Sequence, residues 1–124
     1  MISTDAYFMG RVPPDIEVSR AAVITTEKAN RLIAVYKQAT NDMTPRVVVC
    51  GWSPNKAVDV ASLHHHYGRA IDISDPEGNL DDWCQDHLRT LEQIGLWMEH
   101  PATTRGHCHV QTVEPQSGRR IFNP

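Results

Sequence analysis

The most informative part of this sequence is residues 63–73, which read LHHHYGRAIDI. It leads into a predicted strand over residues 70–74, AIDIS, in which alternate side chains share a face. Ile71 and Ile73 are therefore expected to face the core, while Asp72 points the other way. A carboxylate set in such an apolar strand is costly unless something pairs with it, and a metal ion is one such partner.

Residues 107–113, HCHVQTV, predict a second strand with polar chemistry on one face. Alternation places His107, His109 and Gln111 together on that face. If the two strands lie side by side and antiparallel, Asp72 and His109 meet across the sheet, and the loop before Asp72 supplies a third ligand. Two histidines and one carboxylate are the ligands of an open zinc site, which keeps its fourth position for water. The residues alone leave open which of the three loop histidines takes part.

Two helices are predicted around these strands. Residues 25–38 carry apolar side chains at helical spacing, with Thr25 or Thr26 as the N-cap. The second helix has Asn79 as its N-cap and ends before Gly95. Its predicted buried stripe consists of Trp83, His87, Leu88, Leu91 and Ile94.

Two further strands are predicted, over residues 46–50 and 96–99. The order helix, strand, strand, helix, strand, strand implies an α+β fold with a small, largely antiparallel sheet and two main helices. Residues 1–124 are expected to form a single domain, because a chain of this length supports one core. Residues 1–22 read as an irregular leader and residues 114–124 as a C-terminal tail.

Composition excludes several classes of partner. The formal net charge of −3 gives no electrostatic reason to expect nucleic acid. No apolar run approaches the roughly 20 residues needed to span a bilayer, so no membrane insertion is expected. The N-terminal residues carry no basic and apolar signal peptide, so we expect synthesis in a cytoplasm.

The three cysteines, Cys50, Cys84 and Cys108, are odd in number and widely spaced. This pattern argues against a disulfide framework. All three are interpreted as small hydrophobic residues of the core.

Residues 65–72, HHYGRAID, match the His-x-x-Gly-x-Ala-x-Asp signature of the zinc D-Ala-D-Ala carboxypeptidase and Hedgehog superfamily. Residues 107–110 resemble its closing His-x-His strand, and the resemblance covers about residues 23–113. It is closest to small phage-encoded members. The resemblance implies a Hedgehog/DD-peptidase-like fold in which His65, Asp72 and His109 hold one zinc ion per chain.

The chain departs from the family at two places that concern catalysis. Many bacterial relatives have an acidic residue three positions before the last zinc histidine, where this chain has Gly106. Glu99, on the neighbouring predicted strand, is the best substitute as the catalytic base, and His107 is its hydrogen-bonding or proton-transfer partner. Cys50 begins a stretch, CGWS, where the family usually reads Ser-Gly-Tyr-Arg.

The arginine missing from that stretch commonly holds substrate in the family. Its role would fall to Lys56, Arg69 or Arg105, or be absent, and Trp52 is the best candidate for a wall of the cleft. The substrate-binding residues expected from the resemblance are therefore Trp52, Arg69 and Arg105.

The resemblance implies a zinc metallopeptidase that hydrolyses a peptide bond in the stem peptide or cross-link of bacterial peptidoglycan. Such a protein would be a phage endolysin, released from the host cytoplasm through a holin-made pore, or a lysin carried in the virion. An alternative is a non-catalytic, zinc-stabilised binding or structural module of a phage virion. A cytoplasmic peptidase acting on a non-murein peptide is a third. Glu99 within one water molecule of the metal would favour the enzyme.

Overall fold

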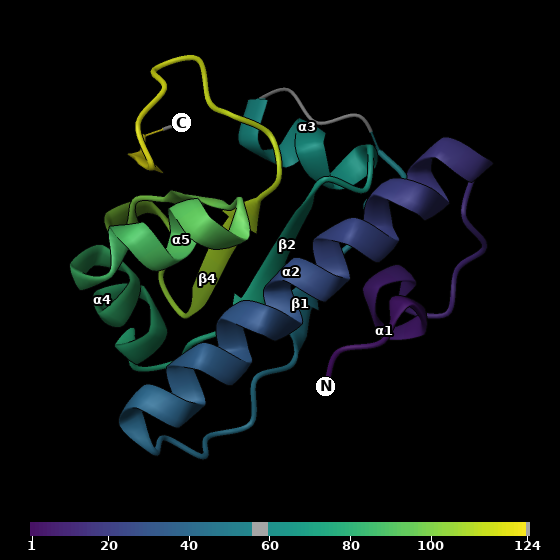
Figure 1. Ribbon diagram of the computed structural model, residues 1–124. Helices are drawn as coiled ribbons and strands as arrows, with labels where there is room; N and C mark the ends of the chain where they lie inside the picture. Colours follow the sequence, from purple (N-terminus) through teal and green to yellow (C-terminus); the bar gives the residue numbers. More distant parts are fainter. Residues whose placement is uncertain (56–59, 124) are drawn as a thin grey trace.

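A five-stranded sheet forms the centre of the computed structural model, which describes residues 1–55 and 60–123 (Figure 1). The strand order is β1-β2-β4-β3-β5. The strands are β1 (Val48–Cys50), β2 (Ala70–Ser74), β3 (Trp97–Glu99), β4 (His107–Gln111) and β5 (Ile121–Phe122). Neighbouring strands are antiparallel except β3 and β5, which are parallel. The predicted α+β class and largely antiparallel sheet are confirmed.

Helices α2 and α5 pack against each other, and Figure 1 shows α2 crossing one side of the sheet. The short helix α3 contacts β2 near the start of that strand. The helices are α1 (Thr4–Phe8), α2 (Ile16–Thr40), α3 (Val60–His66), α4 (Asn79–Asp86) and α5 (Leu88–Ile94), with a 3₁₀ turn at Pro101–Thr103. None of the helices in the described part of the chain has the length and apolar character needed to cross a membrane.

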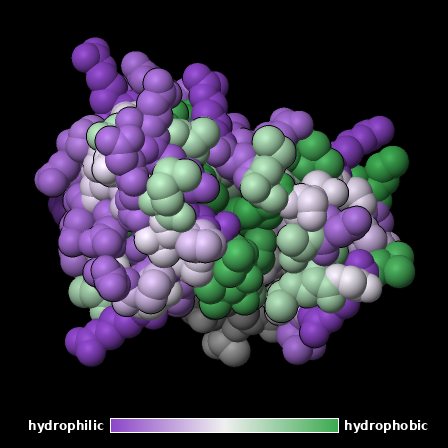
Figure 2. All heavy atoms as spheres, turned by 90° about the horizontal axis from the view of Figure 1, so that it is seen from below, coloured by the Kyte–Doolittle hydropathy of each residue, from purple (hydrophilic) through white to green (hydrophobic). Residues whose placement is uncertain are grey.

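The surface is mixed in polarity. Seen from below the view of Figure 1, apolar side chains gather in a band down the middle of the molecule, beside a broad polar region (Figure 2). Among the large apolar residues exposed anywhere on the described surface are Val47 and Val49, which flank Val48 at the start of β1.

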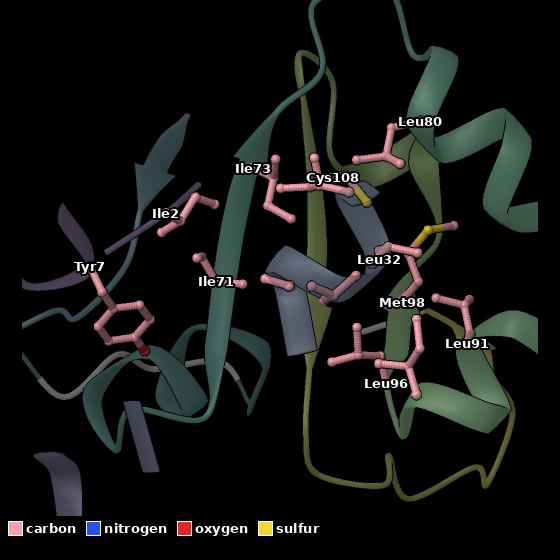
Figure 3. Packing of buried hydrophobic residues seen from close by; sticks show 14 of the residues in the cluster. Ile2, Tyr7, Leu32, Ile71, Ile73, Leu80, Leu91, Leu96, Met98 and Cys108 are labelled. Carbon is pink, nitrogen blue, oxygen red and sulfur yellow. The ribbon is translucent and has the colours of Figure 1, made fainter. Parts of the chain in front are cut away.

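The core lies between the sheet and the helices on one of its faces. Ile71 and Ile73 of β2 are fully buried, as predicted, and so is Cys108 of β4 (Figure 3). They pack in one cluster with Leu32 of α2 and Leu80 of α4. The burial of Cys84 and Cys108 confirms their prediction as core residues. The opposite face of β2 and β4 is thereby left for polar side chains.

The predicted irregular leader over residues 1–22 is wrong, because this segment holds α1 and the first turns of α2. Helix α2 begins at Ile16, where the side chain of Asp15 accepts a hydrogen bond from the backbone N–H of Val18 at 2.9 Å. This is an ordinary N-cap. The C-terminal tail is also partly ordered, since Ile121–Phe122 pairs with β3 as β5.

The predicted N-cap threonines lie inside α2. The hydroxyls of Thr25 and Thr26 donate back to the carbonyls of Ala21 and Ala22, one turn earlier in the helix. Threonine in a helix interior uses this bond when no solvent is available to it. Thr25 also donates to the carbonyl of Gly68 at 2.7 Å, and so joins α2 to the turn before β2.

The second predicted helix is divided at His87 into α4 and α5. Leu91 and Ile94 are buried as predicted, but His87 and Leu88 are exposed and Trp83 is half-buried. The N-cap position is Gly78 rather than Asn79. The first turn of α4 is bonded from outside the helix, by the carboxylate of Asp75, which accepts from the N–H groups of Leu80 and Asp81 at 3.0 and 2.9 Å.

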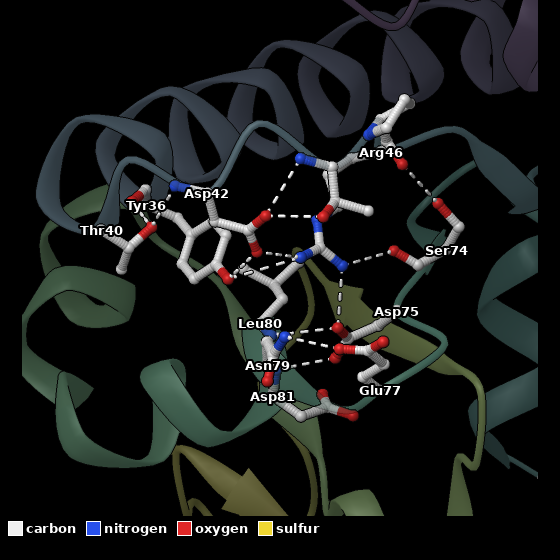
Figure 4. Close-up of polar contacts among 12 residues, drawn as sticks. Tyr36, Thr40, Asp42, Arg46, Ser74, Asp75, Glu77, Asn79, Leu80 and Asp81 are labelled. Carbon is white, nitrogen blue, oxygen red and sulfur yellow. Dashed lines mark hydrogen bonds and ion pairs between the residues drawn. The ribbon is translucent and has the colours of Figure 1, made fainter.

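A buried arginine joins three segments at this end of the domain (Figure 4). The Arg46 guanidinium donates to Asp75 at 2.8 Å, to Asp42 at 2.7 Å and to the carbonyl of Ser74 at 3.1 Å. Tyr36 of α2 donates to the same Asp42 carboxylate. Because Asp75 also holds the start of α4, one buried cation fixes the ends of α2, β2 and α4 relative to one another.

We expect Asp81 to make stability depend on pH. Burial raises the pKa of this carboxyl to about 7, with the charges of Asp75, Asp82 and Glu99 acting in the same direction and Cys108 against it. From about pH 4 to about pH 7 the folded protein therefore keeps a proton that the unfolded chain has lost, and the free energy of unfolding falls as pH rises. Asp81→Asn should flatten this slope in urea titrations.

Asp82, the exposed neighbour of Asp81, provides the control for that experiment. Asp82→Asn removes a charge from the same turn of α4 but from a side chain that is exposed. It should leave most of the slope in place. An Asp81→Asn variant that keeps the full pH dependence would contradict the assignment.

Candidate metal centre

The register of β2 and β4 brings together the first two predicted ligands. Asp72 lies directly opposite His109, on the face away from the core. Nδ1 of His109 is 2.9 Å from Oδ1 of Asp72. His107 comes from the same face of β4, and its Nε2 lies 3.7 Å from Oδ2 of Asp72. Strand alternation therefore predicted this part of the centre correctly.

The third predicted ligand, His65, comes from a helix rather than from the expected loop. It lies in the last turn of α3, and its Nε2 is 3.4 Å from Oδ1 of Asp72. Gly68 makes the turn from α3 into β2 with a φ of 77°, a conformation that L side chains rarely adopt. A Cβ at Gly68 would also lie 2.7 Å from the carbonyl oxygen of Val18, so α2 presses closely on this turn.

The Nδ1 nitrogen of the His65 ring is hydrogen bonded to the backbone. Nδ1 lies 2.8 Å from the carbonyl oxygen of Gly51, which can only accept, so Nδ1 carries the proton. Nε2 is then the nitrogen free to bind a cation. Gly51 is required here because a Cβ would lie 2.1 Å from the carbonyl oxygen of Tyr7.

The His109 ring is oriented in the same way by a side-chain amide. The amide nitrogen of Gln111 donates to the carbonyl of Val113 at 2.8 Å, so its oxygen is the atom that faces His109. That oxygen lies 3.0 Å from Nε2 of His109, which therefore donates. Nδ1 is left to face Asp72. Buried groups that fix a ring tautomer in this manner are typical of the surroundings of metal-binding histidines.

Two rings contact the same carboxylate oxygen: Nε2 of His65 and Nδ1 of His109 lie 3.4 and 2.9 Å from Oδ1 of Asp72. Each nitrogen donates to Asp72 when it carries a proton, and is a potential metal ligand when it does not. Burial alone would lower the pKa of His65, but its contacts with Asp72 and Cys50 raise it to about 10. Burial works against ionisation of Asp72, yet its bonds with His109 and His65 hold the pKa of this carboxyl below its usual range. The site therefore attracts positive charge, either protons or a metal ion.

Cys50 also lies at this centre. The thiol of Cys50, a ring nitrogen of His65 and a carboxylate oxygen of Asp72 all lie within 4.8 Å of one another. The side chain of Cys50 is half-buried, so its interpretation as a core hydrophobe is wrong. Cys50, His65 and Asp72 form a group that could hold a metal ion.

Glu99 is placed on the same face of the sheet but is bonded elsewhere. Its side chain is buried, and its Oε2 accepts a hydrogen bond from the Thr103 hydroxyl at 2.8 Å. In the pairing of β3 with β4, Trp97 lies opposite Gln111. Glu99 follows Trp97 by two residues, so strand alternation places it on the same face as Trp97, Gln111 and His109. Within residues 1–55 and 60–123, no hydrogen bond or ion pair links Glu99 to His65, Asp72 or His109.

The predicted substrate-binding residues differ in burial. Trp52 is buried and packs in the core. Its Nε1 donates to the carbonyl of His66 at 3.0 Å, and this bond helps to fix the residue next to His65. Arg69 and Arg105 are exposed, and Arg69 lies over the ring of Tyr67. Lys56 lies outside the described residues.

His64 and His66 flank the candidate ligand. His66 donates through Nδ1 to the carbonyl of Ser53 at 2.9 Å, which ties the end of α3 to the turn after β1. The pKa of His64 is lowered, chiefly by burial. Neither side chain makes an ion pair with Asp72 in the described structure, unlike His65.

Sequence reasoning missed Cys50 as part of the centre and Gly51 as the residue that orients His65. Gln111 was placed on the correct face, but nothing in the sequence showed that its amide oxygen would face His109. Comparisons with protein-family models, curated proteins and solved structures found no match to this chain.

Proposed function

We propose that this protein is a zinc-dependent peptidase with a Hedgehog/DD-peptidase-like fold that hydrolyses a peptide bond of bacterial peptidoglycan. The observation that supports it best is that His65 and His109 both contact the same carboxylate oxygen of Asp72. Because Nδ1 of His65 donates to Gly51 and Nε2 of His109 donates to Gln111, loss of the other proton from each ring would leave the nitrogen beside Asp72 free to bind a metal ion. This is the ligand set that the signature over residues 65–72 and the His-x-His strand over residues 107–110 imply together.

Two imidazoles and one carboxylate suit zinc, and the proposal is one ion per chain. When bound, such an ion activates a water molecule and polarises the carbonyl of the scissile bond. The rings of His109 and His65 lie 2.9 and 3.4 Å from the same oxygen of Asp72, which supports a shared cation. Gly51 and Gln111 hold the rings in place before the ion arrives.

The remaining residues of the chain supply proton transfer and binding. Glu99 is assigned the role of general base, taking a proton from the attacking water and passing it to the leaving amine. It must turn from Thr103 to do so. His107, whose side chain is about one quarter exposed, is assigned to hydrogen bond with the reacting groups. Arg69 and Arg105 are assigned to the stem peptide, whose carboxylates suit guanidinium partners.

A peptidase of this kind fits a phage endolysin that leaves the host cytoplasm through a holin-made pore, or a lysin carried in the virion. Its partner would be the peptidoglycan stem peptide. The test is digestion of purified murein by the zinc-loaded protein, with mass spectrometry of the released fragments. New peptide termini should appear, vanish after chelation and return when zinc is restored. Intact murein with one bound zinc per chain, both in the wild-type protein and in a Cys50→Ala variant, would contradict the proposal.

The position of Cys50 favours a second candidate, a zinc-stabilised binding or structural module of a virion. A fourth protein ligand would give the closed tetrahedral arrangement of structural zinc sites. In that case, zinc removal should lower the unfolding temperature while murein stays intact with or without the ion.

A further inference from the structure

We propose that the thiolate of Cys50 is a fourth ligand of the metal ion held by His65, Asp72 and His109, and that it closes the site in the resting protein. The inference rests on the metal site of the proposed function. It goes further than the family resemblance, which implies three protein ligands and a fourth position kept for water. The residues that carry it belong to β1, α3 and β2.

A bulge in β1 turns Cys50 toward the site. Val48 lies opposite Ile73, and Cys50 lies opposite Asp72, so three residues of β1 span only two of β2. Residues directly opposite each other in neighbouring strands share a face. Val48 packs against the core, as Ile73 does. In a regular strand Cys50 would follow Val48 onto the core face, and the bulge instead places it on the face of Asp72.

The atoms lie close to bonding positions. Ligands of a tetrahedral zinc ion with bonds of about 2.0–2.3 Å lie roughly 3.3–3.7 Å apart. The thiol, imidazole and carboxylate atoms of Cys50, His65 and Asp72 lie within 4.8 Å of one another. A side-chain movement of about one ångström would bring Cys50 to binding distance. Its sulfur makes a long contact of 3.8 Å with the carbonyl oxygen of Gly51 and interacts with the His65 ring.

The chemistry of the donor set agrees with this assignment. Thiolate, imidazole and carboxylate together form a ligand set that favours zinc over harder ions such as magnesium. With Cys50 bound, four protein atoms surround the ion, and an external ligand finds no free position. Without Cys50, the three remaining ligands leave one position open. Cys50 would therefore control access to the metal.

Cobalt replacement tests the assignment without any assay of turnover. Protein loaded with one cobalt ion per chain should show the near-ultraviolet thiolate-to-cobalt absorption, and azide should leave its spectrum unchanged. Cys50→Ala and Cys50→Ser should keep the cobalt, lose the thiolate absorption and respond to azide. Cys84→Ala is the matched control, because it removes a fully buried thiol and should keep the wild-type spectrum.

A second measurement needs no substitution. Cys84 and Cys108 are fully buried, so Cys50 is the thiol that iodoacetamide should reach in the folded protein. Bound zinc should slow its alkylation at least about tenfold, since a coordinated thiolate is a poorer nucleophile than a free one. Mass spectrometry of the digested protein identifies the modified cysteine.

The outcomes separate this inference from the proposed function. One cobalt per chain with no thiolate absorption, or with absorption that survives in Cys50→Ala, would overturn the role of Cys50 and leave the zinc site intact. An azide response in the wild-type protein would overturn closure of the site. Failure to bind any metal would overturn both proposals.

Discussion

Replacing His109 or His65 by alanine should abolish metal binding. Each substitution removes one of the two rings that contact Oδ1 of Asp72. Changes in groups that merely orient a ligand typically cost 10–100-fold in metal affinity. Loss of a ligand itself should therefore lower the affinity for zinc by at least about 100-fold. Equilibrium dialysis followed by elemental analysis should fall from one zinc per chain toward none.

His87→Ala is the matched control for both variants. His87 is exposed at the junction of α4 and α5 and stacks on Trp83 at 4.0 Å between ring centroids. It should keep the wild-type zinc content. If either His65→Ala or His109→Ala retained full stoichiometry, the assigned ligand set would be incorrect.

Glu99→Gln should keep the zinc and lose the activity on murein. An amide has nearly the shape of the carboxylate, and its oxygen still accepts from Thr103, so the fold is retained. The amide cannot accept a proton at neutral pH, whereas the carboxylate can. General base catalysis typically contributes 10²–10⁴-fold, and kcat should fall by about that factor. The measurement compares initial rates of fragment release from murein, with zinc content determined on the same samples.

Glu92→Gln is the control for this substitution. Glu92 is an exposed residue of α5, and its replacement makes the same chemical change in the helical layer. Its rate should match that of the wild-type protein. Equal rates for Glu99→Gln and Glu92→Gln would show that Glu99 is not the base, and His107 would then be the next residue to replace.

Local periodicity was enough to predict the central part of the fold. Alternation over β2 and β4 gave the buried faces of Ile71 and Ile73, and the opposite placement of Asp72 and His109. This succeeds because the direction of a side chain in a regular strand depends only on its position along the strand. The mixed α+β class and the largely antiparallel sheet follow from the same local patterns.

Helix ends depended on hydrogen bonds that the sequence does not display. Thr25 and Asn79 are good N-cap residues, yet the caps lie at Asp15 and Gly78. Thr25 is used to bond α2 to Gly68, and Asp75 reaches the first turn of α4 from outside it. Competition between equally suitable residues is decided by packing.

The sequence by itself determined two strands, their buried faces and three neighbouring side chains, His65, Asp72 and His109, through alternation and a spaced signature. Only the tertiary structure placed Cys50 beside them, because a single bulge reverses the face on which a strand residue lies. It also decided the ring orientations, since the partners Gly51 and Gln111 are brought to the histidines by chain segments that meet only after folding.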